Sequence, residues 1–250
     1  MPRRPPLGQH FLRDARYVDR SIEAASLRPD DVVLEVGPGK GVLTRALAAR
    51  VAKVVAVEID AALADALERE AIPRVEVVRG DAVEAPLPRF DACVSNLPYQ
   101  ISSPFLFRLL ELPFRVAVLL VQKEFADRLV AKPDTSDYGR LSVNAARRAR
   151  VSIVARVPPG AFDPPPRVDS AIVRIEPRPP AFEVADEALY ARVVEAAFGQ
   201  RRKKISNALA SLPAPWSARL ADLPFADARA GELSPEDFAR VADHLAGGAG

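Results

Sequence analysis

The sequence predicts an α/β fold with a mostly parallel sheet, followed by a small C-terminal helical domain. Short β-type segments alternate with amphipathic helical segments through the first two thirds of the chain, and the strand pattern stops near residue 180. Such alternation is typical of βαβ units, which place helices on both faces of a parallel sheet. We therefore expect a main domain over residues 1–180 and a helical domain over residues 181–250.

Five apolar segments have the composition of buried strands, namely residues 32–36, 54–59, 75–78, 90–94 and 116–121. Helical patterns follow three of them, at residues 42–50, 61–70 and 123–131. Residues 152–157 and 171–176 are too close in sequence for a crossover helix, which indicates an antiparallel pair at a sheet edge. Residues 189–212 and 235–245 have helical periodicity, and Ser234 is a suitable N-cap before Pro235.

The composition is that of a globular protein without a bias toward one partner. Of the 250 residues, 49% are hydrophobic and 27% are charged, and the formal net charge is +2. No apolar run approaches the roughly 20 residues of a membrane span, and the N-terminus lacks the apolar core of a secretion signal. We expect a cytoplasmic protein with no membrane partner. The lone Cys93, with only His10 and His244, argues against a disulfide or a structural metal site, and we expect Cys93 to pack in the core.

A glycine loop follows the first predicted strand, in the sequence EVGPGKG that starts at Glu35. Gly37 and Gly39 would let the backbone approach a ligand closely. Glu58 ends the next strand, 21 positions after Gly37, where a carboxylate can accept hydrogen bonds from both hydroxyls of a ribose. Taken alone, the glycines also fit a plain strand-to-helix turn, but the loop and the acid together indicate a nucleoside cofactor.

Two features favour S-adenosylmethionine (SAM) over NAD. The dinucleotide fingerprint requires its third glycine where this chain has Val42, and the G-x-G-x-G spacing is that of methyltransferase loops. In addition, Asp81 follows the third strand and could accept a hydrogen bond from the adenine amine of the cofactor. Because ligands gather at the carboxyl ends of parallel strands, we expect the loop, Glu58 and Asp81 to meet there.

The sequence Asn96-Leu97-Pro98-Tyr99 follows the fourth strand and predicts chemistry on an adenine. The exocyclic amine of adenine is a poor nucleophile, and hydrogen-bond acceptors on its two protons would favour the reactive geometry. The side-chain oxygen of Asn96 and the backbone carbonyl of Leu97 or Pro98 could supply these acceptors, and Tyr99 could stack on a flipped base. Without the glycine loop, the same residues would fit a simple loop with a surface tyrosine.

A sandwiched base needs a second aromatic ring, and Phe162 is our candidate. It lies in the proline-rich stretch at residues 158–167, which would hold its ring on a stiff loop. The alternative interpretation is that Phe162 anchors this loop to the core.

The chain resembles the ribosomal RNA adenine dimethyltransferases, and most closely the small-subunit enzymes of archaea. The resemblance covers most of residues 8–209 and rests on several blocks in order: GQHFLRD, VLEVGPGKGVLT, VEID, GDA, SNLPYQISSP, QKEFADRLVAKP, YGRLSV, PPGAFDPPPRVDSAIVRI and FGQRRKKISNAL. It implies a Rossmann-like seven-stranded SAM-dependent methyltransferase sheet in the catalytic domain. It also implies dimethylation of two adjacent adenines in the 3′-terminal hairpin loop of small-subunit rRNA, within a pre-ribosomal small subunit.

The resemblance also implies which residues bind the cofactor. The N-terminal segment, residues 1–20, would close over it. Many relatives have Asn where this chain has His10, so a backbone contact is expected there more than a side-chain contact. The predicted cofactor set, extended to immediate neighbours, is His10, Leu12, Gly37, Gly39, Glu58, Ile59, Asp81, Ala82 and Asn96.

Two basic clusters are candidates for contact with RNA phosphates. Each cluster alone would also fit a solvated protein surface. On an RNA-modifying enzyme, they predict that the helical domain binds RNA. We expect a monomer, because the sequence has no coiled-coil pattern and no conspicuous apolar repeat. The predicted RNA-binding residues are Arg140, Arg147, Arg148, Arg150, Arg201, Arg202, Lys203 and Lys204.

Two alternative functions remain open. The adenine-reading motif would also suit an enzyme that methylates large-subunit rRNA or adenine in DNA. A ribosome-assembly factor could keep the fold and bind RNA without turnover, although Glu58, Asp81, Asn96 and Tyr99 argue against a loss of activity.

Overall fold

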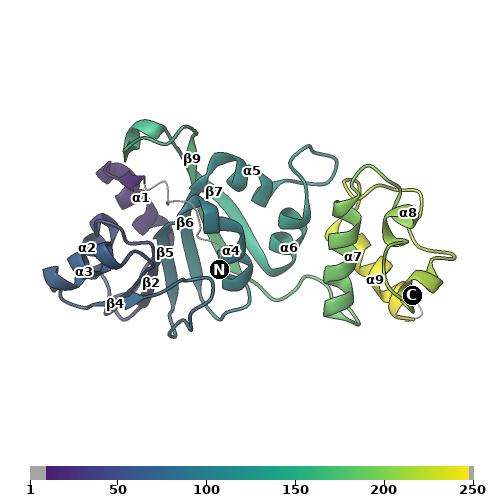
Figure 1. The fold of residues 1–250 in the computed structure, drawn as a ribbon, viewed down its shortest axis with the longest axis horizontal. Coiled ribbons are helices and arrows are strands. Elements are labelled where there is room, and N and C mark those ends of the chain that lie inside the picture. The colour runs from purple at the N-terminus through teal and green to yellow at the C-terminus, as the bar shows by residue number, and fades with distance from the viewer. Residues whose placement is uncertain (1–9, 248–250) are drawn as a thin grey trace. The chain divides into compact units, whose positions relative to one another are not determined.

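The computed structural model describes residues 10–247 and contains a seven-stranded sheet in the order β4-β3-β2-β5-β6-β9-β7 (Figure 1). The pairs from β4 through β6 are parallel, and β9 runs antiparallel to β6. The chain therefore fills one side of the sheet from β2 to β4 and then returns to add β5 and β6 beside β2. This reversal of direction leaves a crevice between β2 and β5, where α/β sheets bind ligands. The strands are β2 (Val32–Val36), β3 (Lys53–Glu58), β4 (Val75–Arg79), β5 (Ala92–Asn96), β6 (Val116–Gln122), β7 (Ala149–Val157) and β9 (Ser170–Pro177).

The predicted α/β class and the edge position of the last two strands are confirmed, because β9 and β7 are neighbours at one end of the sheet. A separate two-stranded sheet pairs β1 (Phe11–Leu12) with β8 (Phe162–Asp163). The helices of the first 150 residues are α1 (Ala15–Ala25), α2 (Val42–Ala48), α3 (Ala61–Glu70), η1 (Tyr99–Ile101), α4 (Ser102–Leu109), α5 (Lys123–Val130) and α6 (Arg140–Arg148). The remaining helices are η2 (Pro159–Ala161), α7 (Glu187–Gly199), α8 (Ile205–Leu209), η3 (Trp216–Arg219) and α9 (Pro235–Ala246).

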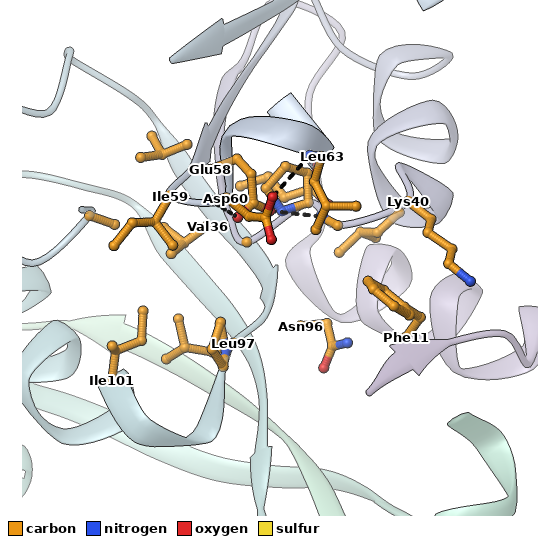
Figure 2. A pocket seen from close by; sticks show the side chains of 18 of the residues that line it. Phe11, Val36, Lys40, Glu58, Ile59, Asp60, Leu63, Asn96, Leu97 and Ile101 are labelled. Carbon is orange, nitrogen blue, oxygen red and sulfur yellow. Dashed lines mark hydrogen bonds between the residues drawn. The ribbon is translucent and has the colours of Figure 1, made fainter. Parts of the chain in front are cut away.

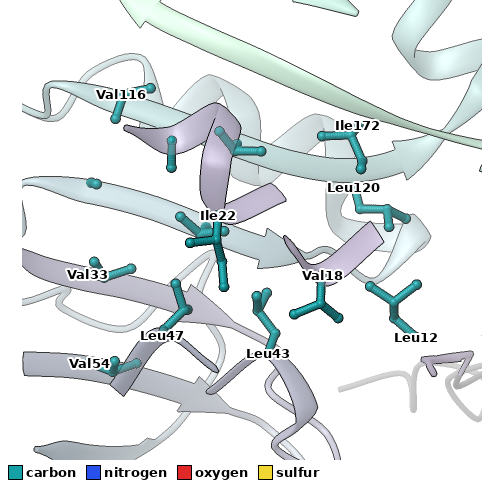
Figure 3. Close-up of a cluster of buried hydrophobic side chains, with 14 of the residues drawn as sticks. Leu12, Val18, Ile22, Val33, Leu43, Leu47, Val54, Val116, Leu120 and Ile172 are labelled. Carbon is teal, nitrogen blue, oxygen red and sulfur yellow. The ribbon is translucent and has the colours of Figure 1, made fainter. Parts of the chain in front are cut away.

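The central strands are apolar at consecutive positions because both faces of the sheet are buried. Val33 and Val54 pack in one cluster with Ile22 of α1 and Leu47 of α2 (Figure 3). The neighbouring strand residues Leu34 and Val55 belong to the opposite face and are also buried. Helices on both faces thus hold the sheet rigid, and its carboxyl edge is a fixed platform for a site.

The chain divides into two compact units. One comprises the residues up to Ala126 together with Val151–Pro177, and the other comprises Asp127–Arg150 together with the residues from Arg178 onward. Compared with the predicted boundary at residue 180, the segment 127–150 belongs to the helical unit and not to the catalytic one. The physical reason is specific contact: Tyr138 is buried in the helical core and its hydroxyl donates to the Leu233 carbonyl over 2.8 Å.

The helical unit also corrects one predicted element. The segment at residues 189–212 is two helices, α7 and α8, because the basic turn after Gly199 breaks the pattern and Lys204 forms a β-bridge with Arg229. Ser234 does cap α9, since its hydroxyl accepts from the Asp237 amide over 3.1 Å and Pro235 occupies the first turn. Among the described residues, the structure has no helix that is long and apolar enough to cross a membrane.

Candidate active site

A cavity of about 560 Å³ opens at the carboxyl ends of the parallel strands (Figure 2). Figure 2 shows Glu58 and Ile59 across this cavity from Asn96 and Leu97. All nine predicted cofactor residues line it, and so do four of the five predicted catalytic residues, Asn96, Leu97, Pro98 and Tyr99. The folded chain thus brings together two sets of residues that the sequence only placed at successive strand ends. Their individual roles stay predictions.

The glycine loop after β2 is packed too closely to accept side chains. Gly37 and Gly39 have φ angles of +67° and +57°, which disfavour residues with a Cβ atom. A Cβ on Gly37 would lie 3.0 Å from the Pro98 ring, and one on Gly39 would lie 2.7 Å from the Phe11 ring. The loop therefore contacts both the Asn96–Tyr99 turn and the N-terminal strand, and it forms the floor on which a ligand would rest.

Glu58 is a fixed carboxylate at the end of β3. Its Oε2 atom accepts from the Gly39 amide over 3.1 Å, and its Oε1 atom accepts from the Asp60 amide over 2.9 Å. The side chain is buried yet lines the cavity. These amides hold the carboxylate in one orientation, as a group that receives two ribose hydroxyls would require.

The loop after β4 is fixed by a residue that the sequence did not indicate. Arg108 of α4 donates to the carbonyls of Ala82 and Ala85 over 3.0 and 2.5 Å. Asp81 starts the same loop, and its Oδ1 atom accepts from the Val83 amide over 2.9 Å. Arg108 thus keeps Asp81 and Ala82 at the cavity wall. It lies in an ordinary amphipathic helix, so no local pattern distinguishes it.

The N-terminal strand closes one side of the cavity. Phe11 pairs with Asp163 and Leu12 pairs with Phe162, while the His10 ring Nδ1 atom lies 2.8 Å from the Pro164 carbonyl. Residues 1–9 of the predicted closing segment, residues 1–20, lie outside the described residues. The part that is described contacts the cavity through His10, Phe11 and Leu12.

The orientation of Asn96 follows from its partner. Its Nδ2 atom donates to the His10 backbone carbonyl over 3.1 Å. A carbonyl oxygen can only accept, so this contact requires the amide nitrogen on that side and leaves the Oδ1 atom for a different donor. The predicted acceptor for an adenine amine is therefore available.

The rest of the turn is equally constrained. The Leu97 amide donates to the Leu120 carbonyl of β6 over 3.1 Å, and the Pro98 carbonyl accepts from the Ile101 amide over 3.1 Å. Because the Pro98 carbonyl already takes part in the first turn of η1, the Leu97 carbonyl is the better second acceptor of the two that we predicted.

Tyr99 lines the cavity, and its hydroxyl is held by Ser170, which lies outside the cavity lining. The hydroxyl lies 2.7 Å from the Ser170 hydroxyl, and the His10 ring lies 6.0 Å from the Tyr99 ring at an angle of 32°. Burial raises the pKa of Tyr99, and the contact with Ser170 opposes this only in part. Tyr99 is therefore a neutral phenol at neutral pH and serves as an aromatic surface rather than as a base.

Phe162 does not occupy the predicted position. Its side chain is 1% exposed and packs in the hydrophobic cluster of the catalytic unit. The cause is its pairing with Leu12 in the small β1–β8 sheet, which turns the ring inward. In this structure Phe162 offers no face to a base, so our prediction of a second stacking ring is wrong for this arrangement and the alternative, a core anchor, applies.

Arg147 is likewise no surface residue. It is 3% exposed, its Nη2 atom donates to Glu187 over 2.6 Å, and its guanidinium lies 4.9 Å from the Tyr190 ring centre. The same ion pair lowers the pKa of Glu187. Arg147 thus holds the helical unit together, and its predicted contact with RNA is wrong for this structure.

The other basic residues differ in what they already bind. Arg140 pairs with Glu195 over 2.6 Å and Lys204 with Asp227 over 2.7 Å, while Arg201 donates to the carbonyls of Thr135 and Ser136. Arg148 is partly exposed, 4.0 Å from Glu187. Three of the predicted RNA-binding residues are exposed and make no side-chain hydrogen bond or ion pair with another described residue. They are Arg150, Arg202 and Lys203.

Cys93 is fully buried, and burial raises its thiol pKa to about 12, so it is a core residue as expected and not a nucleophile. In the described part of the chain, no group of three or more His, Cys, Asp and Glu side chains could hold a metal ion.

Comparison with known proteins agrees with this geometry. The family model described as ribosomal RNA adenine dimethylase matches residues 2–246. A probable ribosomal RNA small subunit methyltransferase A of Methanosarcina mazei is 47% identical over 246 residues, covering 95% of this chain and 91% of the relative. The protein of the same name from Thermococcus kodakarensis is 42% identical, covering 96% of this chain and 88% of the relative.

Solved structures match across both units. A dimethyladenosine transferase from Plasmodium falciparum aligns with a TM-score of 0.80 and 29% identity, covering 93% of this chain and 96% of that one. The 23S rRNA methyltransferase ErmE aligns with a TM-score of 0.70 and 35% identity, covering 94% and 99%. The cavity fits the SAM that these relationships imply, because a side-chain-free glycine floor, the oriented Glu58 carboxylate and the apolar Ile59 line one space. The chain is a SAM-dependent methyltransferase and belongs to the ribosomal RNA adenine dimethylase family.

Proposed function

We propose that this protein transfers methyl groups from SAM to the N6 amines of two adjacent adenines, twice each, in the 3′-terminal hairpin loop of small-subunit rRNA. The observation that carries this proposal is the orientation of Asn96, whose Nδ2 atom is committed to His10 and whose Oδ1 atom is left for an amine. The small-subunit name shared by the archaeal relatives supports the choice of RNA.

The residues present can make an adenine amine reactive. Its lone pair is delocalised into the ring until the nitrogen becomes pyramidal, and acceptors placed on its two protons favour that geometry. The Asn96 side chain and the Leu97 carbonyl supply them, at the position where positive charge develops. The bound cofactor supplies an electrophilic methyl group on a sulfonium. Placing the amine nitrogen in line with that methyl group lowers the remaining barrier. The methylated amine loses its proton to solvent after the transfer, so no strong base is needed.

Recognition of the base requires that it leave its stack. Tyr99 presents its ring to the cavity, and stacking on such a ring compensates part of the cost of flipping the base. We propose that Glu58 binds the ribose of the cofactor, that Asp81 binds its adenine amine, and that Ile59 and Ala82 enclose the adenine.

We further propose that the enzyme acts as a monomer in the cytoplasm, on a pre-ribosomal small subunit, with its helical unit on the RNA. Because Arg147 is buried and Arg140 and Lys204 have acidic partners, the strongest candidates for phosphate contact are Arg150, Arg202 and Lys203.

A second candidate function is methylation of large-subunit rRNA, which the 35% identity to a 23S rRNA methyltransferase favours. The two are separated by one assay. Purified protein and SAM are incubated with small subunits that lack the modification, with large-subunit RNA and with duplex DNA, and each digest is analysed by mass spectrometry. We expect dimethyladenosine in the small-subunit rRNA alone. Its absence there would refute the proposed function.

The double variant Arg202→Ala, Lys203→Ala should weaken RNA binding and reduce its salt dependence. Each lost phosphate contact lowers the slope of log K against log salt by about 0.7 to 0.9, so a fall of about 1.5 is expected. Binding to unmodified small subunits is measured over a range of salt concentrations. The exposed Arg240 of the same unit provides the control variant, Arg240→Ala, and equal slopes in the double variant and the control would contradict these contacts.

A further inference from the structure

Ser170 lies behind the Tyr99 ring, outside the cavity lining. It is the first residue of β9, it is fully buried, and its hydroxyl lies 2.7 Å from the Tyr99 hydroxyl. A buried hydroxyl needs a partner, and here each of the two satisfies the other. The tyrosine is thus held at the tip of its side chain, the point at which a restraint most limits the tilt of the ring.

Both ends of this contact are fixed to the same strand. Ser170 is in register with Gln122 of β6, and the Lys123 amide donates to the Asp169 carbonyl over 2.9 Å. On the other side of β6, the Leu97 amide donates to the Leu120 carbonyl. The sheet therefore sets the separation between the adenine-reading turn and Ser170, and Tyr99 spans it.

We propose that Ser170 is a positioning residue for methyl transfer, which acts by holding the Tyr99 ring at the angle on which the target base stacks. This inference rests on the proposed function, since it assumes that Tyr99 stacks on the adenine. Ser170 itself touches neither the base nor the cofactor. Its effect is on the reacting geometry, because a tilted ring moves the amine away from Asn96 and from the line of attack.

The contact is a structural restraint and not a proton relay. Burial raises the pKa of Tyr99, so the phenol keeps its proton at neutral pH, and a serine hydroxyl is no base. A variant that lacks the contact should therefore lose turnover without a change in the shape of the pH profile.

Ser170→Ala and Tyr99→Phe break the same hydrogen bond from its two ends. Each should lower kcat on unmodified small subunits about tenfold, the size expected when one hydrogen bond is lost. The dissociation constant for SAM should not change. The double variant should be no slower than either single variant, because one interaction can be lost only once. Ser170→Thr, which keeps the hydroxyl, should restore most of the rate.

Two readouts separate this role from a merely structural one. One is the thermal midpoint of each variant, which reports loss of stability, and the other is kcat of the single and double variants. If Ser170→Ala fails to fold, Tyr99→Phe still tests the contact, because Tyr99 is partly exposed. Unchanged kcat in Tyr99→Phe, or independent losses that multiply in the double variant, would overturn the inference. Tyr99→Ala tests the stacking role of Tyr99 separately: if that variant remains as active as the wild type, Tyr99 does not stack on the base, whereas a loss confined to Tyr99→Ala would refute only the role of Ser170. The proposed function itself is tested by the wild type, which must form dimethyladenosine in the small-subunit rRNA.

Discussion

Asn96→Ala should lower methyl transfer to small-subunit rRNA about 10²- to 10³-fold at saturating SAM, the range seen when one preorganised partner of a developing charge is removed. The Asn96 side chain supplies one of two acceptors to the adenine amine, and Ala supplies none. Water could replace the acceptor only at the cost of reorganising in the transition state. The rate is measured by mass spectrometry of digested rRNA over time.

Two further variants make this expectation specific. Asn144→Ala removes an amide of α6 that donates to the Arg140 carbonyl over 2.8 Å, and it should leave the rate unchanged. Asn96→Asp keeps an oxygen toward the substrate but sets a carboxylate against the His10 carbonyl, so its rate should lie between those of Asn96→Ala and the wild type. A variant Asn96→Ala that retains more than about a tenth of the rate would contradict an acceptor role of this size.

The free energy of unfolding should fall as the pH rises from about 4.5 to about 8, because of Glu35. This residue of β2 is 2% exposed, and its Oε2 atom has no hydrogen-bond partner among the described residues. Burial raises its pKa from 4.5 to about 8, and the charge of Glu58 adds to the shift. The folded protein then binds the proton more tightly than the unfolded chain, so the contribution is complete below pH 4.5 and is lost as the pH passes the folded pKa.

The expected size is large. A pKa raised from 4.5 to about 8 corresponds to at most about 5 kcal/mol of unfolding free energy, and partial relaxation of the site reduces it. Glu35→Gln removes the titration, so its unfolding free energy should match that of the wild type near pH 5 and exceed it near about pH 8.5. Denaturant titrations without SAM at both pH values measure this difference.

The exposed Glu84 of the same unit gives the matched control, since Glu84→Gln removes an acid that is not buried. Its pH dependence should follow that of the wild type. Parallel curves for Glu35→Gln and the wild type would show that Glu35 titrates normally in the folded protein.

The sequence was sufficient for features that depend on local pattern. Consecutive apolar residues in β2 and β3 report burial on both faces, and the polar groups that follow those strands must lie at one edge of the sheet. This is why Gly37, Glu58 and Asn96 could be placed at one cavity in advance. Glu35 stood in the same loop motif and could have been included, because it lies one residue before the end of β2 and also lines the cavity.

Features that depend on distant partners could not be read in this way. Phe162 is turned inward by pairing with Leu12, and Tyr99 meets Ser170 across the sheet, in both cases over a long separation in sequence. Arg147 looked like its neighbours in a basic run, but Glu187, 40 residues further along the chain, and two aromatic rings remove it from the surface. A run of basic residues shows that positive charge is present, but the fold determines which of these side chains stay exposed and able to contact RNA.

The contact between Asn96 and His10 also bears on which base the site rejects. Guanine carries an oxygen where adenine carries its amine, and to receive that oxygen the Asn96 amide would have to rotate by half a turn. The rotated Oδ1 atom would then face the His10 carbonyl oxygen, placing two acceptors 3.1 Å apart with no proton between them. In the proposed role, discrimination against guanine therefore originates in the backbone carbonyl of His10, just before the N-terminal strand, at an atom that no side-chain substitution removes.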